Sequence, residues 1–346
     1  MTTFTKTSST SLTFGSYNLL DLYDPTKSHD TDDQARTERV YQVIRALDVD
    51  VLAVQEVMGD HPDPEIKAKS GGDNLAQLAE ATGMKCALPN GKSAIGIGNA
   101  RRHTGLLWKE GITPTGGYRA YSGTYLFNSL LKLHLDVGGY IICGASYQAI
   151  VFGRHRRADE AEMVVSALTR PFQSAHRPPG IIGGDWNGVS ADRVFRPSQN
   201  GRETTGAGNW VFYDEEPDYQ KMNTGEVVYQ TTWKFNENGQ PYFSTDREAG
   251  EILSIGGLRD VAAALDTPWE PTVGHWDKHD PLGKRRIDAI RVTQEVVPAL
   301  LSYSVISDAV SELIGAESVD PKTASDHLPI VMEYEPSLMN TDFPRP

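Results

Sequence analysis

Five predicted strands of this chain carry an acid or an amide at one end. The five ends are Asn18 in "LTFGSYNLL", Glu56 in "VDVLAVQEV", Asp185 and Asn187 in "IIGGDWN", Asp288 in "GKRRIDAIRVT", and Asp326 and His327 in "ASDHLPIVMEYE". Turn chemistry favours Asn, Asp and Gly, but it does not account for Gln55-Glu56 or Asp326-His327. We therefore expect these strand ends to converge on one site.

The converging side chains would be one Glu, three Asp, two Asn and one His. Oxygen ligands with a single imidazole suit Mg²⁺ or Mn²⁺ better than Zn²⁺, and the only cysteines, Cys86 and Cys143, form no zinc-like spacing. Phosphoryl transfer needs a cation, a positioned water and a donor to the phosphate oxygens. A histidine kept protonated by a carboxylate can be that donor. The set predicts a metal-assisted phosphoester hydrolase.

Helical and strand-like segments alternate along most of the chain. Apolar residues recur at helical spacing after Thr31, in residues 74–83 and around 161–168, whereas residues 61–73 are predicted to form a loop. Residues from about 190 to 250 are polar and rich in Gly and Asn, which indicates a long excursion from the core with some helix. We expect a single domain over residues 12–336, with tails at 1–11 and 337–346.

The motifs "SYNLL", "VQEV", "GGDWN", "RRIDAI" and "SDHLP" occur in the order seen in the endonuclease/exonuclease/phosphatase superfamily, the DNase I-like enzymes. Each motif is short, but together they extend from residue 12 to about residue 334. The chain resembles this superfamily over nearly its whole length. The resemblance implies a four-layer α/β sandwich, in which two packed mixed β-sheets are flanked by helices, with one catalytic site at the strand ends.

The resemblance also implies a role for each polar strand end. It implies that Glu56 is the principal metal ligand with Asn18 and Asp326 beside it, that Asp185 orients or deprotonates the attacking water, that Asn187 positions water and phosphate, that His327 contacts the scissile phosphate, and that Asp288 orients and charges this histidine. Structural alternatives remain open: Glu56 could be a surface acid, Asp185 and Asn187 turn residues, and His327 a structural histidine. Asn18 could be a strand-end cap, and Asp288 could form an ordinary ion pair with Arg285 or Arg286.

One departure from the family pattern concerns the strand that precedes "GGDWN". Many relatives carry a His or Tyr there, but this chain reads "CGASYQA", with Ser146 where the histidine would fall. The departure puts a two-histidine mechanism in doubt. Candidate substrate contacts that could compensate are Arg102, His103, Tyr147, Arg154 and Arg156.

The formal net charge of −13 disfavours bulk duplex DNA as the partner. We expect a phosphodiesterase or phosphatase that acts on a small or single-stranded phosphate ester. A DNase-like endonuclease or exonuclease, and a degenerate member that binds a phosphorylated ligand without turnover, are the alternatives. No apolar segment approaches the roughly 20 residues of a membrane span, and the N-terminus lacks an apolar signal region, so we expect a cytoplasmic protein.

Overall fold

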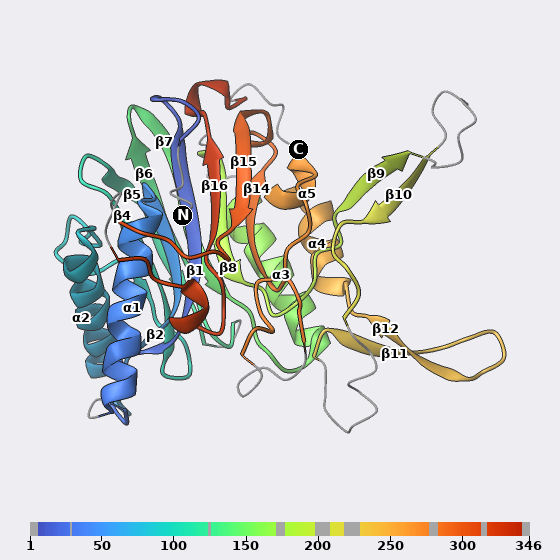
Figure 1. Ribbon diagram of the computed structural model, residues 1–346, viewed down its shortest axis with the longest axis horizontal. Helices are drawn as coiled ribbons and strands as arrows, with labels where there is room; N and C mark the ends of the chain where they lie inside the picture. The colour runs from blue at the N-terminus through green and yellow to red at the C-terminus, as the bar shows by residue number, and fades with distance from the viewer. Residues whose placement is uncertain are drawn as a thin grey trace.

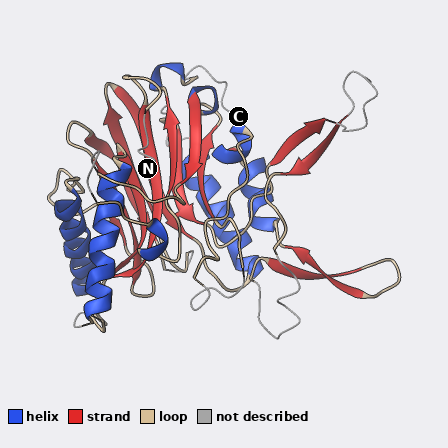
Figure 2. Ribbon diagram, in the orientation of Figure 1, coloured by secondary structure: helices blue, strands red, loops and turns tan. Residues whose placement is uncertain are grey.

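Two six-stranded mixed β-sheets pack face to face, with helices on both outer sides (Figures 1 and 2). This arrangement, in a computed structural model, confirms the expected four-layer sandwich. The structure describes residues 6–27, 30–123, 126–170, 177–197, 208–217, 229–276, 283–312 and 317–340.

The first sheet has β1 and β2 near its centre as a parallel pair, and its other neighbours are antiparallel. Its strands, in spatial order, are β15 (Leu300–Val305), β16 (Ile330–Tyr334), β1 (Leu12–Leu22), β2 (Val51–Met58), β4 (Arg102–Trp108) and β3 (Ile95–Gly96).

The second sheet has the same plan, with β7 and β8 as its parallel pair. Its strands, in spatial order, are β13 (Leu258–Asp260), β14 (Asp288–Thr293), β8 (Gly180–Asp185), β7 (Tyr140–Gln148), β6 (Leu130–Val137) and β5 (Thr113–Tyr121). Our sequence reading did not identify β5 or β15.

Apolar side chains separate the four layers. Phe14 and Leu106 of the first sheet pack with Leu133 and Ile290 of the second in the central core. The outer clusters join α1 (Thr31–Leu47) and α2 (Pro64–Thr82) to the first sheet, and α3 (Arg154–Thr169) and α4 (Glu248–Ile255) to the second. Shorter helices are α5 (Val261–Leu265) and the 3₁₀ turns Val297–Ala299, Pro321–Thr323 and Pro336–Leu338.

Helix α2 begins ten residues earlier than the sequence reading placed it, because residues 64–73 are helical and not a loop. The start signals were present in the sequence. The Asp63 side chain caps the helix by accepting from the backbone N–H groups of Glu65 and Ile66, and Pro64 stands in the first turn, where its missing N–H costs nothing.

The excursion after residue 190 contains two β-hairpins and α4. The hairpins, β9 (Arg193–Pro197) with β10 (Gly208–Phe212) and β11 (Thr231–Phe235) with β12 (Pro241–Thr245), project from the same side of the sandwich (Figure 1). Residues 198–207 and 218–228 of this region lie outside the described residues.

The expected N-terminal tail is attached to the sandwich from residue 6 onward. The Thr7 backbone N–H donates to the Glu333 carboxylate at 2.6 Å, and the buried Ser11 hydroxyl donates to the same group. Among the described residues, no helix is both long and apolar enough to cross a membrane.

Candidate active site

The topology explains why the polar strand ends meet. Each sheet has one central parallel pair, β1 with β2 and β7 with β8, so the carboxyl ends of each pair lie together. The Asn18 side chain of β1 donates to Asp185 at the end of β8 at 3.2 Å, so the two sheets meet at this edge of the sandwich. Strand β14 runs antiparallel to β8 and places Asp288 directly opposite Asp185. Strand β16 runs antiparallel to β1 with Ile330 opposite Ser16, so His327, just before β16, lies beside the end of β1.

Glu56 reaches the site through a β-bulge. The pairing of β2 with β4 shifts register between Gln55 and Val57, and Glu56 adopts a left-handed backbone conformation with φ of 63°. The bulge re-aims the carboxylate toward the second sheet. Its Oε1 atom accepts from the Asn18 Nδ2 atom at 3.2 Å, and its Oε2 atom accepts from the Asp21 backbone N–H at 3.2 Å.

Asp185 and Asn187 form the floor of the same site. The Asp185 carboxylate accepts from the Asn187 backbone N–H at 3.0 Å, and from the side-chain NH₂ groups of Asn187 and Asn18 at 3.2 Å each. Asn187 also has a left-handed φ of 47° and donates to the Ala149 carbonyl oxygen at 3.1 Å. Trp186, between them, turns away into the core and donates to the Ala289 carbonyl oxygen.

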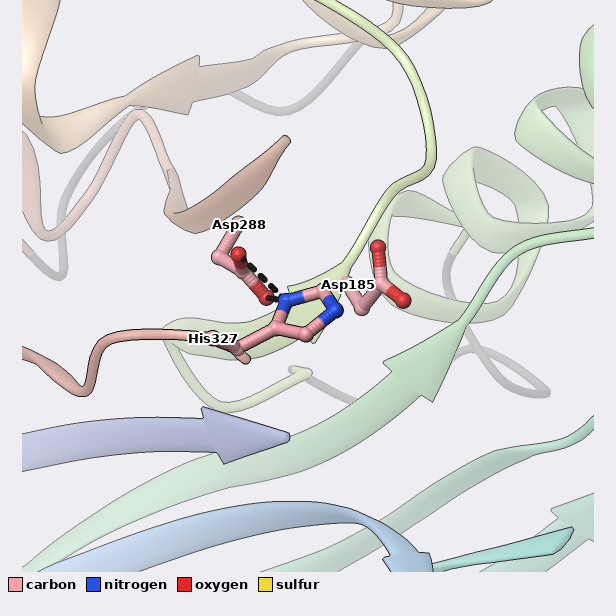
Figure 3. A group of neighbouring side chains, drawn as sticks. All are labelled: Asp185, Asp288 and His327. Carbon is pink, nitrogen blue, oxygen red and sulfur yellow. Dashed lines mark hydrogen bonds and ion pairs between the residues drawn. The ribbon is translucent and has the colours of Figure 1, made fainter. Parts of the chain in front are cut away.

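His327 lies between two carboxylates (Figure 3). Its Nδ1 atom is 2.8 Å and 3.0 Å from the two Asp288 carboxylate oxygens, while Asp185 lies on the Nε2 side of the ring. Burial alone would lower the His327 pKa, but the negative charges of Asp288 and Asp326 raise this pKa well above its ordinary value. The geometry therefore favours an imidazolium ion. Asp288 pairs with this histidine and not with Arg285 or Arg286.

The site concentrates negative charge in a buried place. Burial raises the pKa of Asp185 to about 7, while the positive charge of His327 opposes this rise and Asp288 adds to it. Burial likewise raises the pKa of Glu56, which Arg102 lowers and which Asp21 and Asp326 raise. Perturbed carboxylates of this kind cluster at catalytic and ion-binding sites.

Comparison with known proteins agrees with this geometry. The Endonuclease/Exonuclease/phosphatase family matches residues 15–327. The chain belongs to this family. Its members hydrolyse phosphoesters and typically depend on divalent metals. Among curated proteins, none matches the chain.

Solved structures share the fold at low sequence identity. A family protein from Bacteroides thetaiotaomicron is 18% identical, with a TM-score of 0.54 over 94% of this chain and 97% of its own. A mannosyl-6-phosphatase from the same species is 17% identical, with a TM-score of 0.53 over 93% and 99%. A humanised D. rerio TDP2 is 14% identical, with a TM-score of 0.52 over 94% and 99%. These similarities show the fold alone.

The charge balance of this family member fits a divalent cation. Five carboxylates act on one another here against two positive groups, Arg102 and His327; the carboxylates are Asp21, Glu56, Asp185, Asp288 and Asp326. The ligand atoms of Asp185, Asp288 and His327 lie within 4.8 Å of one another. Because the His327 Nδ1 atom already pairs with Asp288, the oxygen ligands that suit Mg²⁺ are on the Glu56 side of the site.

Asn18 presents a different group to the site than the resemblance implied. Its oxygen accepts from the Leu20 backbone N–H at 3.1 Å, and its NH₂ group faces Glu56 and Asp185. In this orientation the Asn18 amide holds the two carboxylates and offers no oxygen to a metal. Asp326 is half-buried next to His327, and its charge acts on Glu56 and Arg102, which suits a metal-side acid.

The sequence reading overlooked Gln148. Side chains alternate along β7, so Ser146 and Gln148 share the face toward the first sheet, and only Gln148 lies at the strand end opposite Asp185. Its Nε2 atom donates to Glu56 Oε1 at 2.8 Å and to Asp185 Oδ2 at 3.4 Å. Ser146 lies deeper and donates to the Val54 carbonyl oxygen. Counting the alternation of side chains back from the end of this strand, and not from the family position at Ser146, identifies Gln148.

Two of the five candidate substrate contacts point away from the site. Tyr147 is fully buried on the opposite face of β7, where its hydroxyl donates to Glu160 and its ring packs on Trp186. His103 is buried between Gly59 and Gly98, with its Nε2 atom 2.9 Å from the Gly59 carbonyl oxygen, and burial lowers its pKa to about 4. Neither side chain is placed to bind substrate, so these two expectations need correction.

The three arginines differ in their surroundings. Arg102 lies at the site, where its Nε atom is 2.6 Å from Asp21 and its guanidinium is 3.3 Å from Glu56 Oε1. Arg154 donates to the Thr232 hydroxyl, and Arg156 stacks over the Phe127 ring at 5.6 Å. These contacts of Arg154 and Arg156 involve neither Glu56, Asp185 nor His327. Of the three arginines, only Arg102 contacts a residue of the site.

Proposed function

We propose that the protein is a divalent-metal-dependent phosphoester hydrolase, a phosphodiesterase or phosphatase that acts on a small or single-stranded phosphate ester. The observation that carries this proposal is the His327 imidazole, charged by Asp288 on one side and facing Asp185 on the other. A cationic donor and a carboxylate base that face each other across one ring suit the attack of water on a phosphate.

In this proposal each side chain has a distinct task. Asp185 accepts a proton from the attacking water, and Asn187 fixes the Asp185 carboxylate through its backbone and side-chain N–H groups. His327 donates a hydrogen bond to a non-bridging phosphate oxygen as negative charge develops in the transition state. Its charge also lowers the Asp185 pKa, which keeps more of this base ionised near neutral pH.

We assign the metal to Glu56 and Asp326, with Mg²⁺ or Mn²⁺ as the expected ion. A bound cation would neutralise charge on the phosphate oxygens. Arg102, held by Asp21 beside Glu56, adds positive charge on the same side and is suited to contact the phosphate. The mannosyl-6-phosphatase neighbour shares the fold at 17% identity, so it does not select the substrate of this chain.

The direct test is hydrolysis of p-nitrophenyl phosphate and bis-p-nitrophenyl phosphate in Mg²⁺ or Mn²⁺, with a chelator as the metal-free condition. We expect cation-dependent release of p-nitrophenol and a loss of ~10²-fold or more in His327→Ala. His155→Ala is the matched control, because the His155 side chain is 74% exposed and lies near Glu248, which is not a residue of the candidate site. Binding of phosphate without turnover in either metal would instead identify a non-catalytic member of the family.

A further inference from the structure

Gln148 joins the two carboxylates that the proposed mechanism uses. It extends from the end of β7 in the second sheet, and its NH₂ group donates to Glu56 of the first sheet and to Asp185 of the neighbouring strand β8. The residue is 1% exposed. Because both partners are acceptors, the NH₂ group must face them, and these contacts fix which end of the amide is oxygen.

The other end of this amide lacks a partner. The Gln148 Oε1 atom is buried and accepts no hydrogen bond from any described residue. A buried carbonyl oxygen without a donor is costly, and native proteins satisfy nearly all such groups with protein, water or ligand. The unpaired acceptor therefore points to a donor that arrives with the reaction components.

We propose that Gln148 positions the attacking water, accepting one of its hydrogens at Oε1 while Asp185 accepts the other. This inference rests on the proposed hydrolase function. The water oxygen forms its bond to phosphorus, and the ester P–O bond breaks with its electron pair on the leaving oxygen. Asp185 takes one hydrogen as a proton, and the second stays on the new phosphate oxygen, hydrogen-bonded to Gln148. Two acceptors fix both O–H directions, which aims a lone pair at the phosphorus.

An alcohol in place of water tests this geometry, because methanol has one hydroxyl hydrogen and cannot use both acceptors. In a water–methanol mixture, p-nitrophenyl phosphate yields inorganic phosphate from water and methyl phosphate from methanol, and phosphorus NMR measures their ratio. Loss of the Gln148 acceptor should slow attack by water more than attack by methanol. The two products come from the same active site in the same sample, so a general loss of activity does not alter their ratio.

The variant is Gln148→Met, which keeps the length of the side chain and removes its polar atoms. We expect its methyl phosphate to phosphate ratio to rise about two- to tenfold over wild type, the factor that corresponds to one net hydrogen bond. Ser146→Ala is the matched control, because Ser146 lies on the same face of β7 two residues earlier and is hydrogen-bonded to Val54 away from the strand end. Its ratio should equal that of wild type.

If the ratio in Gln148→Met equals that of wild type, the assignment is overturned. It is also overturned if neither protein forms methyl phosphate. A lower melting temperature with an unchanged ratio would mean that Oε1 holds only a structural water. A higher Mg²⁺ requirement with an unchanged ratio would mean that Oε1 is a metal ligand. A wild-type protein that hydrolyses no ester in Mg²⁺ or Mn²⁺ refutes the proposed hydrolase itself, and this result is known before the variants are compared.

Discussion

At the residue scale, Glu56 shows how the site concentrates charge. Its carboxylate is buried, and the negative charges of Asp21 and Asp326 act on it beside the positive charge of Arg102, so a cation should bind here more strongly than at an exposed acid. We predict that Glu56→Gln raises the Mg²⁺ concentration needed for half-maximal activity and lowers the rate by orders of magnitude, while the circular dichroism spectrum stays that of wild type. Titration of activity with Mg²⁺ checks this, and full wild-type activity in a chelator contradicts it.

His327 and Asp288 give a prediction about pH. Removal of the Asp288 charge in Asp288→Asn should lower the His327 pKa, because Asp288 is the charge that raises this pKa most. The imidazolium ion is then lost at a lower pH, so the alkaline limb of the pH–rate profile should move toward acid. The profile of kcat/KM from pH 5 to about 10 measures this movement, over the range in which histidine titrates. An alkaline limb at the wild-type position would show that Asp288 does not charge the histidine.

The sequence predicts the site residues whose residue types are unusual at a strand end. It does not predict features that depend on backbone geometry alone. Glu56, Asp185, Asp288 and His327 were identified because acids and a histidine recur at such ends. The β-bulge that turns Glu56 inward has no local signal, since its φ of 63° suits glycine better than glutamate. Gln148 carries no charge, and its role depends on which side chains of β7 face the first sheet.

At the element scale, β8 packs closely against the first sheet at Gly183. A Cβ atom on Gly183 would lie 2.6 Å from the Ser16 Cβ atom and 3.0 Å from that of Ala53. We predict that Gly183→Ala lowers the free energy of unfolding by about 1–3 kcal/mol, because the methyl group must push the two sheets apart. Activity should fall as well, since Asn18 and Asp185 lie on the two separated strands.

Urea unfolding of this variant measures the loss, with Gly72→Ala in helix α2 as the control. The nearest atom to a Cβ at Gly72 is 3.6 Å away, which is ordinary contact, so alanine should be neutral or stabilise the helix by up to about 1 kcal/mol. A Gly183→Ala protein as stable as wild type would show that the sheets have room to adjust.

The elements themselves were predictable where periodicity was strong. The apolar runs of β2 and β8 and the amphipathic face of α1 were identified, because burial imposes a clear pattern on them. Strand β5 is largely exposed, and its sequence, TPTGGYRAY, has no alternation of apolar and polar residues. It therefore lacks that pattern. The hairpins after residue 190 are also mostly exposed, and the polar, Gly- and Asn-rich sequence around their strands favours a loop.

At the scale of the whole molecule, the distribution of positive charge decides which polyanions can bind. The chain carries a formal net charge of −13. Two buried arginines are paired internally: Arg286 is 2.6 Å from Asp214 and 2.5 Å from Asp260, and Arg157 is 2.8 Å from Asp246. Guanidinium groups held in this way are not available to follow a phosphate backbone.

We therefore predict that bulk duplex DNA is a poor substrate and that salt affects activity on the preferred ester only weakly. An enzyme that contacts duplex phosphates loses affinity with a log–log slope of about −0.9 for each phosphate neutralised, whereas a small ester needs one or two such contacts. Local positive charge from Arg102 and a bound cation could still attract DNA to the site, so the comparison must be direct. Supercoiled plasmid and a panel of nucleotides, sugar phosphates and phosphodiesters should be assayed in Mg²⁺ or Mn²⁺ across about 50–200 mM salt. Efficient nicking of plasmid at low enzyme concentration, steeply salt-dependent and abolished in His327→Ala, would make this protein a nuclease.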